Sequence, residues 1–444
     1  MPETLWAKDL PLDERLHAFT VGNDRTTDLA LLSFDAEGSA AHARMLGECG
    51  LLYLAEAKAL VGALRELKAE AERGELTITP EQEDGHTTLE VALTQRLGTT
   101  GRRIHLARSR NDQVQTALRL LMRARLLDLG ETLERCASAF LSFAREHADS
   151  PLPGYTHLRR AMPSSWGMWA SAFAEGLLEE LEQLPAIWSR LDRSPLGAAA
   201  GFGVPVAINR KRSAELLGFS RVQRSPIDVM NGRGRHEQAV AAWIVSAAGT
   251  LENAIWDLLL WSTEEFGFVR LPDAFTTGSS LMPQKRNPDV LELARGRCRE
   301  LRGLSGLLAE LAGGLPSSYH RDHQLLKAPL LEITAKGAEL FAVLAHLLPG
   351  LKINEKACTT ASTAELHAAN NACQLAADGM PFRDAYATVA RQLQDGTFVP
   401  AVDDAAAPGL HFDEMKKELQ QSQAWLAERK EFLKETSARL FDWS

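Results

Sequence analysis

The chain has 444 residues, of which 45% are hydrophobic and 24% are charged, and 58 acidic against 49 basic side chains give a net charge of −9. This composition is typical of a globular protein with a sizeable core. It excludes a disordered chain, a collagen-like fibre and a small disulfide scaffold. The acidic balance argues against a nucleic-acid partner, because neutralising phosphates needs a basic surface.

The N-terminus and the cysteines indicate the cellular setting. The first residues have mixed charge and no apolar core, so we expect no signal peptide. The most apolar long stretch, 243–261, contains Glu252 and Asp257 and predicts a buried helix instead of a membrane span. The cysteines form no C-x-x-C motif, which predicts neither a disulfide framework nor a zinc ribbon. We therefore expect a cytoplasmic protein with no membrane partner.

Helical periodicity dominates the chain. Apolar residues between 60 and 71 mark an amphipathic helix closed by Gly74. From 122 to 143 apolar residues recur in alternating steps of four and three, within a proline-free segment from about 111 to 147. At 1.5 Å per residue that helix would be roughly 55 Å long, which is typical of a helical bundle.

Later segments continue this pattern. Helices are predicted at 163–191, 236–266, 288–311 and 325–348. The third has Asn287 as a candidate N-cap and Pro288 as its first residue. Alternating strand patterns are nearly absent. We therefore expect an all-α protein with a central bundle of about five long helices and smaller helical N- and C-terminal domains. The expected divisions are 1–105, 106–357 and 358–444.

The breaks between the predicted helices carry unusual polar sequence, at 83–88, 105–113, 154–157, 278–289 and 319–324. The second and fourth concentrate basic residues in an otherwise acidic chain. Cationic loops at helix starts suit small carboxylates or phosphates, because free backbone N–H groups and the helix dipole add to their charge. For the second break an ordinary helix start, with a capping box from Ser109 to Asp112, is an equal alternative.

The fourth break has the composition of a catalytic loop. Gly278 allows a hinge, two serines offer hydroxyls, and Lys285 and Asn287 offer donors. A catalytic lid needs this combination: a hinge, a hydroxyl that can be activated, and donors directed at developing negative charge.

These segments resemble those of a known superfamily. Residues 278–289 resemble the signature of the fumarase/aspartase superfamily. The run 108–113, with 154–157 and 315–327, is similar to the argininosuccinate lyase family within it. The resemblance implies a homotetramer whose active sites each combine loops of three subunits. It also implies a β-elimination that splits argininosuccinate into arginine and fumarate, in arginine biosynthesis, without a metal or organic cofactor. The sequence holds no zinc-protease, P-loop or complete dinucleotide motif.

The resemblance also implies roles for individual residues. Removing a proton from the carbon beside a carboxylate drives extra charge onto that carboxylate, giving an aci-carboxylate that needs fixed donors. Ser279 would be the base, with Lys285 and Asn287 as donors and His157 as acid, relay or orienting group. Serine is a poor base unless loop amides and Lys285 favour its deprotonated form. The implied substrate-binding residues are His86, Thr87, Ser109, Arg110, Asn111, Thr156, Tyr319, Gln324 and Lys327.

The chain departs from the family pattern in three places. Leu325 and Leu326 stand where the family has two acids. The segment 231–234 keeps the arginine of the family's pattern but not its acidic residues. The family's substrate-binding serine has no clear counterpart near Asn23 and Asp24. These changes touch the amino-acid end of the substrate more than the elimination centre. Two alternatives stay open: a sister lyase, such as adenylosuccinate lyase or carboxymuconate cycloisomerase, and a non-catalytic crystallin-like protein.

Overall fold

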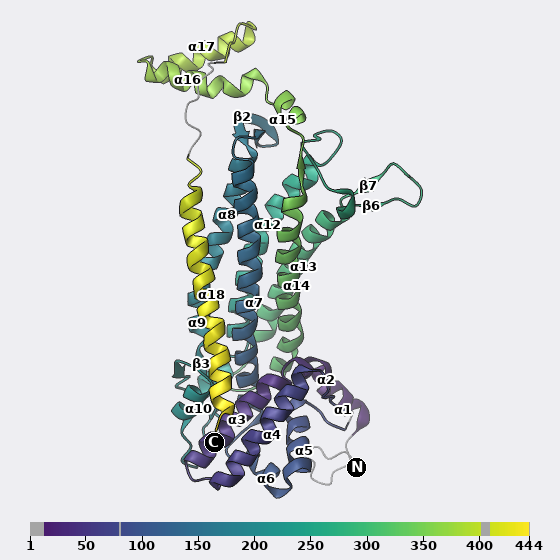
Figure 1. Ribbon diagram of the computed structural model, residues 1–444, viewed down its shortest axis with the longest axis vertical. Coiled ribbons are helices and arrows are strands. Elements are labelled where there is room, and N and C mark those ends of the chain that lie inside the picture. The colour runs from purple at the N-terminus through teal and green to yellow at the C-terminus, as the bar shows by residue number, and fades with distance from the viewer. Residues whose placement is uncertain (1–12, 80, 401–408, 444) are drawn as a thin grey trace.

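The computed structural model describes residues 13–79, 81–400 and 409–443. Long helices form its long axis, and smaller helical parts lie at both ends (Figure 1). The expectation of no signal peptide rests partly on residues 1–12, which lie outside this description. In the described ranges, no helix combines the length and the apolar run that crossing a membrane requires.

The N-terminal part has a hydrophobic core of its own. It is centred on α3 and α4, where Leu46, Leu60 and Leu64 are fully buried. The amphipathic helix predicted before Gly74 is confirmed as α4. The elements of this part are α1 (Glu14–Val21), α2 (Asp24–Thr27), η1 (Asp28–Ala30), α3 (Leu32–Glu48), α4 (Leu54–Glu72), α5 (Gly85–Leu97), α6 (Thr99–Arg102) and η2 (Arg103–His105).

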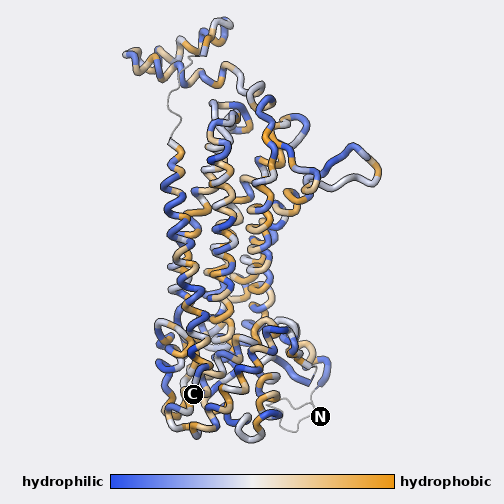
Figure 2. Tube along the Cα trace, viewed as in Figure 1, coloured by the Kyte–Doolittle hydropathy of each residue, from blue (hydrophilic) through white to orange (hydrophobic). Residues whose placement is uncertain are grey.

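The central bundle confirms the predicted all-α fold. Its long helices are α7 (Arg110–Glu146), α8 (Trp166–Glu182), α12 (Arg235–Trp261), α13 (Asp289–Ala312) and α14 (Lys327–Leu347). The apolar stripe of the 37-residue α7 is buried in a second core, which includes Leu126, Leu133 and Phe140. Hydrophobic residues run along these helices in Figure 2. Burial of these stripes is the main force that holds such rods side by side.

The C-terminal part leaves the bundle and then returns to it. After η5 (Leu348–Gly350) and β8 (Lys352–Ile353) come α15 (Glu355–Ala361), η6 (Ala364–His367), α16 (Ala368–Ala377), α17 (Phe382–Gln394) and finally α18 (Phe412–Phe441). The 30-residue α18 packs along α7 and α8. Residues of α18 share the hydrophobic core of the bundle. The predicted division at 105/106 and 357/358 stays a prediction.

Two sequence predictions about helix boundaries are wrong. The helix predicted at 163–191 begins as β2 (Arg159–Ser165), which pairs with β1 (Pro151–Thr156) in an antiparallel hairpin. It is also interrupted before α9 (Leu184–Leu191), because Pro185 favours a new helix start. The N-cap of α13 is Pro288, and Asn287 belongs to β7 (Arg286–Asn287), which pairs with β6 (Thr277–Gly278).

The remaining short elements connect the long helices. They are β3 (Arg193–Ser194), α10 (Arg210–Leu216), β4 (Arg221–Val222), α11 (Pro226–Asn231), β5 (Val269–Arg270), η3 (Asp273–Phe275) and η4 (Arg321–Leu326). β3 pairs with β4 in parallel, and β5 pairs with β8 antiparallel.

Candidate active site

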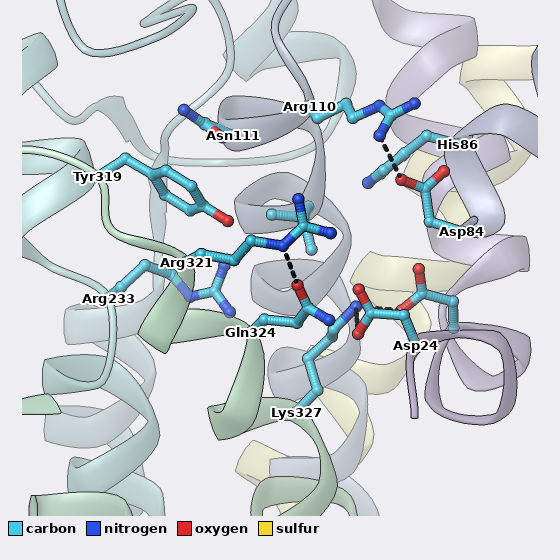
Figure 3. Close-up of a pocket in the computed structure, with 12 residues that line it drawn as sticks. Asp24, Asp84, His86, Arg110, Asn111, Arg233, Tyr319, Arg321, Gln324 and Lys327 are labelled. Carbon is cyan, nitrogen blue, oxygen red and sulfur yellow. Dashed lines mark hydrogen bonds and ion pairs between the residues drawn. The ribbon is translucent and has the colours of Figure 1, made fainter. Parts of the chain in front are cut away.

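A pocket of about 160 Å³ lies where the N-terminal part meets the bundle (Figure 3). Its walls come from α2, the starts of α5 and α7, and the segment that leads into α14. Six predicted substrate-binding residues line it: His86, Arg110, Asn111, Tyr319, Gln324 and Lys327. The other lining residues are Asp24, Asp28, Asp84, Val114, Arg233 and Arg321, which the sequence analysis did not assign to binding.

Thr87 and Ser109 lie beside this pocket as parts of helix starts. Thr87 is buried, and both its N–H and its hydroxyl donate to Oδ1 of Asp84, at 2.8 Å each. Ser109 is the N-cap of α7, and its N–H donates to Oδ1 of Asp112 at 3.0 Å. The capping box considered for this segment is therefore present. Substrate binding by Thr87 and Ser109 stays a prediction.

Acidic neighbours favour the protonated form of His86 at the pocket wall. Its Nδ1 lies 2.5 Å from Oδ2 of Asp35, and both residues are buried. Burial lowers the pKa of His86, but the carboxylates of Asp35, Asp84 and Asp28 outweigh it and hold the pKa above its ordinary value. A protonated imidazole at this wall is suited to an anionic group of a ligand.

Arg110 is engaged by acids of the preceding break. Its Nη1 donates to Oε2 of Glu83 at 2.7 Å and lies 3.3 Å from Oδ2 of Asp84. Burial raises the pKa of Asp84, but the charges of His86 and Arg110 outweigh that effect and lower it overall. This ion-pair network fixes the start of α5 against the start of α7.

Lys327 and two aspartates form a buried charge cluster at the pocket floor. The Nζ of Lys327 lies 2.6 Å from Oδ1 of Asp24 and 2.5 Å from Oδ1 of Asp28. Burial raises the pKa of Asp24 to about 6; Lys327 opposes this shift and Asp28 adds to it. The only sequence signal for the two acids is their spacing of four residues, which places them on one helix face.

Lys327→Met is expected to destabilise the protein strongly. The two buried carboxylates would lose their cation, and breaking a buried ion pair from one side costs about 3–5 kcal/mol. Urea unfolding followed by circular dichroism measures this loss. The matched control is Lys336→Met on the same helix, where the partners Glu300 and Glu332 are surface residues. The control should cost about 0–1 kcal/mol, and an equal loss in both variants would contradict the prediction.

Asp24→Asn is expected to change how stability depends on pH. The folded protein retains the Asp24 proton between the ordinary pKa of 3.8 and about 6, whereas the unfolded chain releases it. This carboxyl therefore contributes stability that is complete below the ordinary pKa and is lost as pH rises through the folded value. The unfolding free energy of the variant minus that of the wild type should rise across this window and level off above it. A difference independent of pH would refute the assignment.

Asn231, in the run that departs from the family pattern, forms hydrogen bonds with the segment that precedes η4 and α14. Asn231 donates from Nδ2 to Oγ of Ser317 at 2.9 Å, and its Oδ1 accepts from the N–H of Ser318 at 2.6 Å. These bonds position Tyr319, the next residue. Gly234 has φ of 81°, and a Cβ there would lie 2.2 Å from Cβ of Ala312. Glycine thus lets the start of α12 approach the end of α13.

Gln324 ties the segment before α14 to the end of α1 at this pocket. Its Nε2 donates to the carbonyl oxygens of Thr20 at 3.0 Å and Val21 at 2.8 Å, at the end of α1. Its Oε1 accepts from Nε of Arg321 at 3.1 Å. Of the two leucines that replace acids, Leu325 is 60% exposed and Leu326 is buried.

Ser279, Lys285 and Asn287 lie away from this pocket, in and beside the loop between β6 and β7. This loop projects from the side of the bundle (Figure 1). The Oγ of Ser279 accepts hydrogen bonds from the N–H groups of Leu281 at 3.2 Å and Met282 at 3.0 Å. Two amide donors at one oxygen favour negative charge on it. Lys285 is exposed, and Asn287 is half-buried in β7.

Thr156 and His157 lie at the other end of the bundle. They stand at the turn of the β1–β2 hairpin, where both are exposed and His157 has φ of 52°. α7 separates them from Ser109, and its 37 residues span roughly 55 Å. One chain therefore presents the predicted site residues as three separate groups: the pocket, the 279–287 loop and the hairpin turn.

Comparisons with known proteins define the class. A family model described as "Lyase" matches residues 10–303. The fold resembles EDDS lyase in complex with formate, with a TM-score of 0.79 and 22% identity, covering 98% of this chain and 95% of that one. It also resembles 3-carboxy-cis,cis-muconate lactonizing enzyme from Pseudomonas putida, with a TM-score of 0.67 and 20% identity, covering 95% and 98%. The protein is a lyase enzyme of the fumarase/aspartase superfamily.

Curated relatives narrow the class. The argininosuccinate lyase of Sorangium cellulosum is 43% identical over 411 residues, 92% of this chain and 94% of its own. That of Parabacteroides distasonis is 39% identical over 401 residues, 90% of each chain. That of Thermotoga neapolitana is 37% identical over 392 residues, 88% of this chain and 98% of its own. The chain belongs to the argininosuccinate lyase family.

Proposed function

We propose that the protein acts on argininosuccinate and eliminates fumarate from it, releasing arginine. The observation that carries this proposal is the identity of 36% to 43% with argininosuccinate lyases across about nine-tenths of the chain. The pocket supports it, because it gathers six of the residues that the resemblance assigns to substrate binding.

In the proposed reaction Ser279 is the base. Its Oγ, deprotonated under the influence of two loop amides, takes a proton from the succinyl carbon beside a carboxylate. The released electron pair moves into that carboxylate, and Lys285 and Asn287 donate to the resulting aci-carboxylate. The pair then returns to form the double bond of fumarate while the bond to the guanidino nitrogen breaks. The bonding electrons leave with that nitrogen, which takes a proton as arginine departs, and His157 orients the substrate or relays this proton.

The proposed enzyme is a homotetramer with shared sites. Groups at the two ends of α7 cannot reach one small substrate within a single chain, because roughly 55 Å separates them. Copies packed side by side through their long helices would bring a hairpin turn, a 279–287 loop and a pocket together. We propose that the enzyme works in the cytoplasm, in arginine biosynthesis and in the urea cycle, which uses the same reaction. Because the proposed reaction needs no metal, a chelator should leave its activity unchanged.

One assay separates the proposal from its alternatives. Purified protein is incubated with argininosuccinate, adenylosuccinate or carboxymuconate, and fumarate or product formation is followed by ultraviolet absorbance. Fumarate from argininosuccinate alone is expected. Turnover of either other substrate in its place would assign a sister lyase. No turnover of any of them, in a folded oligomer, would leave the crystallin-like structural role.

A further inference from the structure

A second pocket lies at the parallel β3–β4 pair, in the same end of the bundle as the first. Its volume is about 260 Å³, and it is lined by Arg193, Arg221, Val222, Gln223, Arg224, Ser225 and Asp228. None of these residues lines the pocket of Figure 3. We call it the arginine pocket. It takes no part in the proposed elimination.

Three arginines and one carboxylate, Asp228, line the arginine pocket, so its charge is positive on balance. Arg193 and Arg221 are direct partners in the β3–β4 register, so two like charges stand side by side. Such a pair is unfavourable unless something offsets it. Within the described ranges, Arg193, Arg221 and Arg224 make no ion pair with an acid. The carboxylate on the lining, Asp228, is engaged by Arg235 at 3.0 Å and by Nε2 of Gln223 at 2.8 Å.

One donor of the pocket is also unsatisfied. The Nε of Arg193 is buried and has no hydrogen-bond partner in the part of the chain that the structure describes. Five other arginines in the described ranges share this feature at Nε, so it gives the pocket a free donor without identifying a ligand. Ser225 adds a hydroxyl: its Oγ accepts from the N–H of Asp228 at 3.3 Å, which leaves its O–H proton free to donate.

The pKa shifts of Arg193 and of the nearby His236 are consistent with a positive electrostatic potential at this pocket. Burial lowers the pKa of Arg193, and the charges of Arg221 and Arg235 lower it further, while the charge of Asp228 opposes them. Burial also lowers the pKa of His236 to about 2, with Arg119, Arg235, Arg190 and Arg193 adding to the effect. A concentration of cations in a chain of net charge −9 is a local property of this site.

We propose that the arginine pocket binds a phosphate group, either inorganic phosphate or the phosphate of a small metabolite. The arginines come from β3, from β4 and from the residue two positions beyond β4, so they approach from different segments. A phosphate offers acceptor oxygens in several directions and takes bidentate bonds from guanidinium groups, whereas a carboxylate offers two oxygens in one plane. α11 connects this pocket to Asn231, which positions Tyr319 in the first pocket.

Calorimetric titration of the full-length protein with inorganic phosphate, at constant ionic strength, tests the proposal. The pocket variant is Arg221→Gln/Arg224→Gln, which changes two exposed side chains. The matched control is Arg125→Gln/Arg383→Gln, which removes two exposed charges from α7 and α17. Wild type and control should bind phosphate saturably and alike, and the pocket variant should bind at least ten times more weakly, with circular dichroism unchanged.

Two further titrations sharpen the result. Glycerol 3-phosphate binding more tightly than inorganic phosphate would identify a phosphate ester as the ligand class, and the reverse order would identify the free ion. Arg321→Gln, in the first pocket, should leave phosphate affinity unchanged. The proposal is overturned if wild type shows no saturable binding, if the pocket variant binds as well as the control, or if Arg321→Gln abolishes binding.

Discussion

Ser279→Ala is expected to lower turnover of argininosuccinate by about 10³-fold or more, the scale of a lost general base. The substitution removes the oxygen that accepts the N–H groups of Leu281 and Met282, and no other atom of the loop replaces it. The loop projects from the bundle, so folding and assembly should be unaffected (Figure 1). Fumarate formation measures turnover, and circular dichroism with size-exclusion chromatography measures integrity.

The neighbouring Ser280→Ala is the matched control. Ser280 is an exposed hydroxyl in the same loop, and the amides of Leu281 and Met282 donate to Ser279 instead of to it. It should keep activity near that of the wild type. Appreciable turnover by Ser279→Ala, or an equal loss in both variants, would remove Ser279 as the base.

Mixing two inactive variants is expected to restore activity if the sites are shared between subunits. His157→Ala damages the hairpin turn and Lys285→Met damages the 279–287 loop, and these groups lie apart within one chain. After co-refolding or co-expression in equal amounts, some sites receive an intact turn from one subunit and an intact loop from another. For random assembly of a symmetric oligomer the recovery should approach about a quarter of wild-type activity.

The control mixes Ser279→Ala with Lys285→Met. Both substitutions lie on the same loop, so every site receives a damaged loop whichever subunit provides it. No activity should return. Recovery in this control, or none in the His157 and Lys285 mixture despite mixed oligomers, would contradict shared sites.

The fold could be predicted where local pattern and packing agree. α7 was predicted nearly to the residue, because its apolar stripe is the face that the bundle buries. The stretch from 163 to 165 was misassigned to a helix, since its pairing with β1 is a tertiary contact that no helical pattern reveals. The return of α18 to the bundle is also a tertiary contact, because its main partner, α7, precedes it by almost three hundred residues.

The candidate site divides in a similar way. Motifs indicated the residue types, and the loop amides at Ser279 were anticipated because loops expose N–H groups. The acids around Lys327 were missed, because Asp24 and Asp28 meet it only after folding brings α2 and η1 against the start of α14. The sequence also led us to expect one site that combines the pocket residues, the 279–287 loop and the hairpin turn. It did not show that these three groups lie far apart along the bundle of one chain.

The continuity of α7 has a consequence for how this chain can vary. Inserting one residue in a helix turns everything beyond it by about 100° and advances it by 1.5 Å. In α7 such an insertion would rotate the hairpin turn that carries His157 relative to the pocket that contains Asn111. Surface loops generally tolerate a change of length, whereas the length of α7 is constrained at both ends.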